Sequence, residues 1–168
     1  MLLGGLSQQY RTMYEKAIDT AKRILFYRPM TPNEDDILIS AGVAIKSDSD
    51  FRLDPQGQHL VCFVGGMMGI GSRIFSRPDD LPIARKLVEG CIWAYRQMPS
   101  GIMPESFHVV PCENTTSCKW DEKKWLAGVE SRHDDLEVGA SGITPEQIKE
   151  LGLFPGFTDI PDRRYILR

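Results

Sequence analysis

The sequence lacks the features that mark several classes of protein. None of its apolar runs reaches the roughly 18 residues that a membrane-spanning helix needs. The first residues, MLLGGLSQQYRT, contain no basic segment ahead of an apolar one, so we do not expect them to act as a signal peptide. The formal net charge is only -3, which gives no electrostatic reason to expect nucleic acid or an anionic membrane as a partner. No Cys-x-x-Cys spacing indicates a zinc site or a thioredoxin-like motif.

What is present is the composition of an ordinary globular protein. Hydrophobic residues make up 42% and charged residues 26% of the 168 residues, enough for one domain with its own core. The cysteines could all be reduced, buried thiols. Their even number, together with the glycosylation triplet Asn-Thr-Thr at Asn114, instead favours an oxidising secretory compartment. The four cysteines are Cys62, Cys91, Cys112 and Cys118.

Helical periodicity dominates the chain. Apolar residues recur at helical spacing over 8–27, where Ser7 is a natural N-cap, and again from Asp79 or Asp80 to about residue 95. Segment 58–75 is apolar nearly all round and rich in glycine. A phosphate-binding loop is the alternative for these glycines, but the segment lacks Gly-Lys-Ser/Thr, so we expect a buried helix that neighbours approach closely. Two short helices are expected over 119–130 and 144–151, the second with Thr144 as N-cap.

Strand signals are few. Segment 35–55 is rich in β-branched residues and is divided by the polar stretch Ser-Asp-Ser-Asp, which indicates a β-hairpin or two short strands. Helix pairs separated by long loops, without alternating strands, predict an all-α architecture of the α/α type decorated with small β-hairpins.

One carboxylate has an unusual setting. Glu105 ends the turn PSGIMPE, whose two prolines and one glycine stiffen the chain just before an extended run that contains His108. A rigid turn suits a side chain that must be held in one position, as in a preorganised site. A solvated loop residue and one half of a catalytic pair are both compatible with this pattern.

Several stretches together resemble one enzyme family. They are GGLSQQYRTMYEKAID, DILIS, HLVCFVGGMMGIGS, GCIWAYRQMPSGIMPESFH and DRRYILR, in this order. In content and spacing they resemble the class I α-1,2-mannosidases, glycoside hydrolase family forty-seven. The resemblance implies an (α/α)7 barrel and removal of α-1,2-linked mannose from high-mannose N-glycans in the secretory pathway, with inversion and with calcium. It also implies a monomer, and identifies residues 1–168 as a partial catalytic domain that is truncated at both ends.

The resemblance also assigns roles to individual residues. Glu105 matches a carboxylate of the family's active-site cavity, and His59 matches the histidine of HLVCF at that cavity. Arg168 matches the arginine directly before the family's Pro-Glu motif, whose glutamate is the expected base and is absent here. Cys62 and Cys91 match the family disulfide, and a local bridge between Cys112 and Cys118 stays open. The threonine that binds calcium belongs downstream of this chain, so no metal ligand is expected within it.

The other conspicuous side chains suggest structural roles. Trp120 and Trp125 could stack on sugar, but packing of a short helix is the simpler interpretation, and His108 and His133 suggest packing and loop positions. No second catalytic acid stands out. Two other functions compete with hydrolysis: a lectin-like protein that binds mannose-rich glycans without cleaving them, and a fragment with no activity of its own. We expect the chain alone to be inactive, because inversion needs two carboxyl groups.

Overall fold

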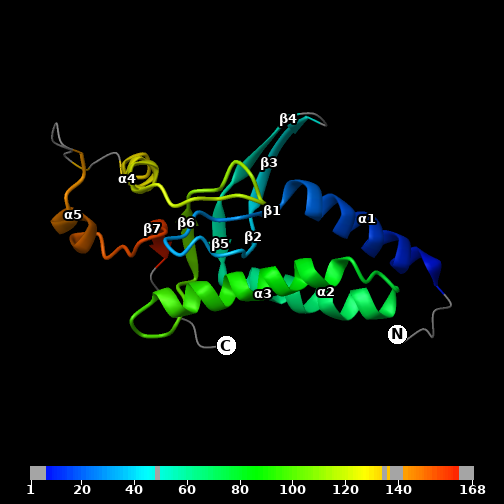
Figure 1. Ribbon diagram of the computed structural model, residues 1–168. Coiled ribbons are helices and arrows are strands. Elements are labelled where there is room, and N and C mark those ends of the chain that lie inside the picture. The colour runs from blue at the N-terminus through cyan, green and yellow to red at the C-terminus, as the bar shows by residue number, and fades with distance from the viewer. Residues whose placement is uncertain (1–6, 48–49, 134–135, 137–141, 163–168) are drawn as a thin grey trace.

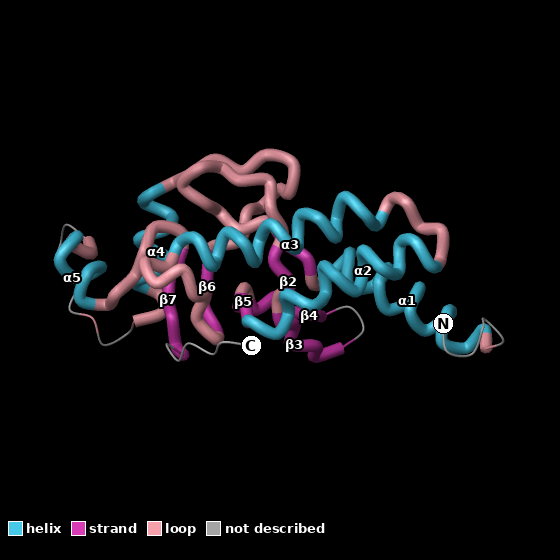
Figure 2. Tube along the Cα trace, turned by 90° about the horizontal axis from the view of Figure 1, so that it is seen from below, coloured by secondary structure: helices cyan, strands magenta, loops and turns pink. Residues whose placement is uncertain are grey.

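The computed structural model describes residues 7–47, 50–133, 136 and 142–162. Figures 1 and 2 show α1 at one end of the molecule, α4 and α5 at the other, and short strands between them. The helices are α1 (Gln8–Ile24), α2 (Cys62–Ile74), α3 (Asp80–Gln97), α4 (Glu122–Glu130) and α5 (Pro145–Glu150), and the 3-10 turn η1 (His59–Val61) leads into α2. The strands are β1 (Phe26–Tyr27), β2 (Ile39–Ser40), β3 (Gly42–Ser47), β4 (Asp50–Asp54), β5 (Gln56–Gln58), β6 (Ser106–Val109) and β7 (Phe157–Asp162).

Helices α2 and α3 form a helical hairpin and lie side by side in both views (Figures 1 and 2). Gly65 allows their close approach, because a Cβ atom there would lie 2.7 Å from Val88 Cγ2 and 3.0 Å from the Ala84 carbonyl oxygen. Met68 of α2 is fully buried in a small cluster with Ile18 of α1 and Leu87 of α3. The glycines expected to permit close packing do so at Gly65.

A buried carboxylate joins α1 to the start of α3. Asp80 is only 1% exposed, and its two oxygens accept from Lys22 Nζ and Arg77 Nε, each at 2.7 Å. Burial alone raises the Asp80 pKa, but the hydrogen bonds from Arg77 and Lys22 outweigh it and hold the pKa below its ordinary value. Asp80 therefore does more than place a negative charge at the beginning of a helix.

The strands form three antiparallel sheets, β1–β2, β3–β4 and β5–β6–β7. In the third sheet Gly57 lies opposite Phe107, and Val109 lies opposite Phe157. The main core packs against this sheet, with Trp93 of α3 tilted over Phe157 at 5.0 Å between ring centroids. Trp125 of α4 is 5% exposed and its Nε1 donates to the Phe157 carbonyl at 2.9 Å, which confirms packing for this residue.

The helices and the hairpin agree with the sequence, with two corrections. Helix α1 ends at Ile24 rather than at residue 27, because Phe26 and Tyr27 pair with Ile39 and Ser40 as a strand. The architecture is helix-rich with small antiparallel sheets, and the correction concerns their extent: besides the expected hairpin, β5, β6 and β7 form a three-stranded sheet that we did not expect. These strands are three to six residues long, too short to show a clear alternation, and their partners are distant in sequence.

Helix ends follow the capping rules only in part. Thr144 Oγ1 accepts from Gln147 N at 3.3 Å, and Gln147 Oε1 accepts from Thr144 N at 2.9 Å, so α5 begins with a capping box as its sequence indicates. Ser7 lies at the N-cap position of α1, but its side chain makes no capping hydrogen bond. No helix in the described ranges is both long and apolar enough to pass through a membrane.

One face of the α2–α3 hairpin is apolar and uncovered. Phe63 and Ile70 of α2 are 72% and 63% exposed, although each is a large hydrophobic residue. The spacing i, i+4, i+7, i+11 places one row of such residues on a single side of α2. The row consists of Phe63, Met67, Ile70 and Ile74. We call these four residues the α2 stripe.

Candidate functional site

The sheet brings Glu105 and His59 together. Gln58 at the end of β5 pairs with Ser106 at the start of β6. His59, which follows Gln58, and Glu105, which precedes Ser106, therefore both lie just beyond this pair. The His59 backbone N–H donates to the Glu105 carbonyl oxygen at 2.9 Å. Pro104, directly before Glu105, is fully buried, so the stiff turn is anchored in the core. Two residues far apart in the sequence thus occupy one end of the sheet.

A tyrosine fixes the His59 ring. Tyr95 of α3 lies 2.7 Å from His59 Nε2 through its hydroxyl oxygen, and the two rings meet edge to face. His59 is 9% exposed, and within the described chain its Nδ1 and Glu105 Oε2 are buried without hydrogen-bond partners. Buried polar atoms without partners are costly and rare in folded proteins. They identify this end of the sheet as a place where a ligand can form hydrogen bonds with these two atoms.

The disulfide between Cys62 and Cys91 supports the same contact. The structure contains this bridge, with Cα atoms 5.8 Å apart. Cys62 lies three residues after His59, and Cys91 lies four residues before Tyr95. The bridge and the His59–Tyr95 contact are therefore successive links between α3 and the segment formed by η1 and the start of α2. The Met103 sulfur lies 3.8 Å from Cys62 Sγ, which connects the bridge to the turn that carries Glu105. Cys112 and Cys118 are joined as well, which answers the question that the sequence left open.

Strand β7 ends at this site. Asp162 lies opposite Ser106, so β7 finishes at the end of the sheet where Glu105 and His59 lie. Arg168, the third predicted site residue, is outside the described residues, so its place beside the other two stays a prediction. Sequence reasoning missed Tyr95, although its position four residues after Cys91 on one helix places both on the same face.

Comparison with known proteins identifies the family. Residues 1–168 match the model of glycosyl hydrolase family 47. The chain belongs to this family. "Probable mannosyl-oligosaccharide alpha-1,2-mannosidase 1B" of Aspergillus fumigatus is 34% identical over 96 residues, 55% of this chain and 17% of that protein. "Mannosyl-oligosaccharide alpha-1,2-mannosidase 1B" of Aspergillus oryzae is 38% identical over 63 residues, 38% of this chain and 12% of that protein.

A third relative gives the same picture. "Mannosyl-oligosaccharide alpha-1,2-mannosidase 1B" of Aspergillus phoenicis is 42% identical over 63 residues, again 12% of that protein. The chain therefore spans less than a fifth of the length of these curated relatives. This family 47 chain therefore matches only one section of each of these relatives.

Other carboxylates of this family 47 chain are engaged elsewhere. Asp80 is held by Lys22 and Arg77, and Asp121 caps α4 by accepting from Lys124 N at 3.1 Å. Asp134 and Asp135 lie outside the described residues. Among the described residues no group of three or more His, Cys, Asp or Glu side chains is arranged to hold a metal ion. The side chains that the structure describes therefore do not fit a calcium site.

A second polar cluster was missed by sequence reasoning. His108 of β6 lies between Asp54 and Asp159, with ring nitrogens 3.6 Å and 3.4 Å from their carboxylate oxygens, and Arg132 contacts Asp54 at 3.5 Å. His133 lies 3.8 Å from the other Asp159 oxygen. Burial lowers the pKa of His108, and Arg132 acts in the same direction, while Asp54 and Asp159 oppose the shift. His108 is packed, as its sequence position suggested, but its neighbours are charged side chains.

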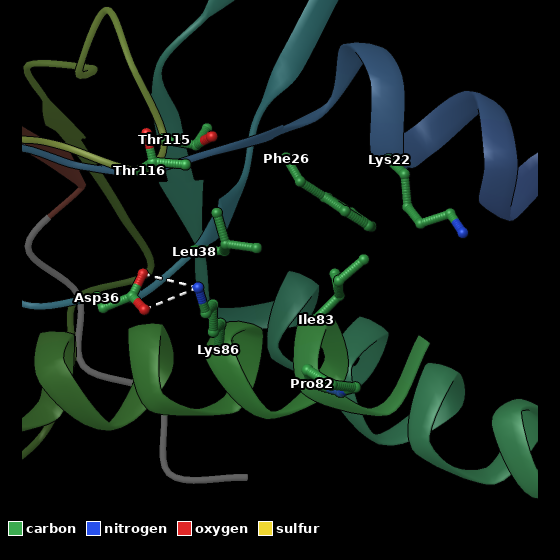
Figure 3. A pocket seen from close by; sticks show the side chains of 9 residues that line it. All are labelled: Lys22, Phe26, Asp36, Leu38, Pro82, Ile83, Lys86, Thr115 and Thr116. Atoms are coloured by element: carbon green, nitrogen blue, oxygen red, sulfur yellow. Dashed lines mark hydrogen bonds and ion pairs between the residues drawn. The ribbon is translucent and has the colours of Figure 1, made fainter. Parts of the chain in front are cut away.

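Two hollows of the described chain show what surrounds Glu105: one lies away from it, and the one beside it is small. Figure 3 shows a groove of about 460 Å³ between Phe26, Leu38 and Ile83, with Thr115 and Thr116 at one rim and an ion pair of Lys86 and Asp36. Neither Glu105 nor His59 lines it. A hollow bounded by Gln58, Cys91 and Met103, beside the site, holds about 10 Å³, which is too small for a sugar ring. Neither of these two hollows is a sugar-binding cavity at Glu105.

Proposed function

We propose that the protein to which this chain belongs is a mannosyl-oligosaccharide α-1,2-mannosidase that removes terminal α-1,2-linked mannose from high-mannose N-glycans with inversion. Membership of glycosyl hydrolase family 47 supports the reaction class, and the names of its relatives support the linkage. The observation that carries a role for this chain is a pair of buried atoms at one end of the sheet, Glu105 Oε2 and His59 Nδ1, that have no hydrogen-bond partner among the described residues.

Glu105 acts as one carboxyl group of an inverting pair. In such enzymes one carboxyl protonates the leaving glycosidic oxygen, while a carboxylate roughly 6.5–9.5 Å away takes a proton from the attacking water. Since the water attacks the opposite face of the sugar ring, the second group must come from across the cavity. We assign Glu105 as one of these two carboxyl groups and place the other in residues outside this chain. His59 and Arg168 are assigned to substrate binding.

The α2 stripe supports the (α/α)7 barrel as the complete fold. Four large apolar residues on one side of a helix are normally covered, and a contiguous exposed patch of this kind marks a contact surface. We propose that neighbouring helices of the complete catalytic domain cover it. Replacement of Phe63 by serine should raise the solubility of the isolated chain and lower the melting temperature of the longer protein. A lower solubility of the isolated variant would contradict this assignment.

The remaining properties follow from the same assignment. Calcium, when bound, supplies a cation that can hold and polarise sugar hydroxyl groups, and its ligands lie outside the residues described here. The enzyme works on glycoproteins in the secretory pathway, where the two disulfides are stable. It acts as a monomer, since a single catalytic domain provides all the carboxyl groups that inversion needs.

The decisive experiment measures hydrolysis of α-1,2-mannobiose in the presence of calcium. We expect no turnover above buffer for the isolated chain, because general acid–base assistance is worth about 10²–10⁴-fold for each group and one group is missing. A protein extended at both ends should be active, and Glu105→Gln should reduce its kcat by at least about 10²-fold. The matched control is Glu122→Gln, an exposed glutamate in the first turn of α4, which should leave kcat unchanged.

The opposite outcomes are equally clear. Turnover by the isolated chain that disappears in Glu105→Gln would show that a second carboxyl within 1–168 completes the pair. Inversion is checked by following the anomeric configuration of the first product by NMR, and a retained configuration would refute the mechanism. Binding of mannose-rich glycans by the extended protein without any hydrolysis would favour the lectin-like alternative.

A further inference from the structure

A short disulfide loop carries the only glycosylation triplet of the chain. The sequence contains two asparagines, and only Asn114 is followed by threonine two residues later; Asn33 is followed by Glu-Asp. The Cys112–Cys118 bridge closes the loop around Asn114, with Cα atoms 5.7 Å apart. The loop is also tied to the end of β1, because Cys112 N donates to the Arg28 carbonyl oxygen at 2.9 Å.

The loop presents the asparagine side chain to solvent. Residues Glu113 to Ser117 are all exposed, so a bulky group on Asn114 meets no buried neighbour. Asn114 Oδ1 accepts from Thr116 N at 2.8 Å and from Thr116 Oγ1 at 2.6 Å. Both bonds use the oxygen of the carboxamide, and neither uses its amide nitrogen, Nδ2. The turn thus joins the two residues that define the triplet and leaves the atom to which a sugar is attached out of both bonds.

We propose that Asn114 carries an N-linked glycan, displayed by the Cys112–Cys118 loop. The donor is an oligosaccharide linked to a lipid diphosphate. A bond forms between Asn114 Nδ2 and the anomeric carbon of the donor, and the bond from that carbon to the diphosphate oxygen breaks. The diphosphate leaves with the electron pair, and the amide nitrogen loses one proton. The inference rests on the secretory route that is part of the proposed function, but not on hydrolysis of mannose.

The glycan lies away from the candidate site. Glu105 precedes β6 and Cys112 follows it, so the loop and the site lie at opposite ends of this strand (Figure 1). Thr115 and Thr116 line the groove beside Ile83 near the start of α3, whereas Tyr95 contacts His59 near its end (Figure 3). A rise of 1.5 Å per residue places about 18 Å of helix between Ile83 and Tyr95. A glycan on Asn114 therefore leaves access to Glu105 open.

The test is to secrete the chain from a eukaryotic cell behind a cleavable secretion signal and to map its peptides by mass spectrometry. Trypsin releases residues 97–119 as one peptide that contains the triplet and both loop cysteines. We expect this peptide to carry hexose and N-acetylhexosamine masses, and peptide N-glycosidase in heavy-oxygen water to convert Asn114 to a labelled aspartate. The analysis includes protein retained inside the cell, so that a variant which fails to fold is still scored.

The loop offers matched variants. Asn114→Gln and Thr116→Ala should each abolish the modification, whereas Thr115→Ala preserves an Asn-Ala-Thr triplet and should keep it. Asn33→Gln should have no effect. An unmodified peptide 97–119 in both secreted and retained wild-type protein would overturn the proposal, as would a glycan that survives in Thr116→Ala. Neither result bears on Glu105, since hydrolysis is measured separately; in the extended protein, Asn114→Gln should leave kcat unchanged.

Discussion

Removal of the Cys62–Cys91 bridge should destabilise the protein more than removal of the Cys112–Cys118 bridge. The two bridges differ mainly in the length of chain that they close, with sequence separations of 29 and 6. In the chain-entropy model, a cross-link lowers the entropy of the unfolded chain by an amount that grows with the logarithm of this length. These separations correspond to about 3.6 kcal/mol for the long loop and about 2.2 kcal/mol for the short one at 25 °C.

The packing of the cysteines does not separate the two bridges, because Cys62, Cys112 and Cys118 all pack against the main core. The difference in stability therefore rests on the length of chain that each bridge closes. The double alanine variant at Cys62 and Cys91 should lose about 1.4 kcal/mol more than the double variant at Cys112 and Cys118. Removal of the Cys62–Cys91 bridge should also perturb the candidate site, because the bridge lies next to the His59–Tyr95 contact.

The assay is equilibrium unfolding in urea under non-reducing conditions, followed by tryptophan fluorescence, which reports on the buried rings of Trp93 and Trp125. The three proteins to compare are the wild type and the two double alanine variants. Equal losses in the two variants, or a larger loss for the short loop, would refute the reasoning from loop length. A wild-type protein with four free thiols after non-reducing purification would remove its premise.

Two further predictions concern buried charge. Asp80→Asn should lower the free energy of unfolding by about 3 kcal/mol, because Lys22 and Arg77 lose a charged acceptor, while Asp79→Asn, one exposed residue earlier, should change it by less than about 0.5 kcal/mol. Similar losses in both urea titrations would contradict this. Stability should also fall as the pH drops below the ordinary histidine value of 6.5, because the unfolded chain binds a proton that folded His108 resists. His108→Gln should flatten this fall between pH 8 and 5, and an unchanged slope would rule out His108 as its source.

Local patterns in the sequence determined the helices. Apolar spacing located α1, α2 and α3, and Thr144 followed by Pro145 located the start of α5, because these signals depend on neighbours within four residues. The motif that ends at Glu105, with its resemblance to a family, singled out this residue for the candidate site. The Cys62–Cys91 pairing also came from the resemblance, whereas the bridge between Cys112 and Cys118 was left open until the structure joined these cysteines.

Only the tertiary structure decided which side chains meet. Strand β5 has three residues and reveals its place only by pairing with β6, whose residues lie about fifty positions further along the chain. That pairing joins His59 to Glu105, and the packing of α2 on α3 brings Tyr95 to His59. Burial acts in the same way on His108, whose charged neighbours come from three other segments. Contacts between distant segments depend on the whole packing arrangement, so periodicity within one segment cannot encode them.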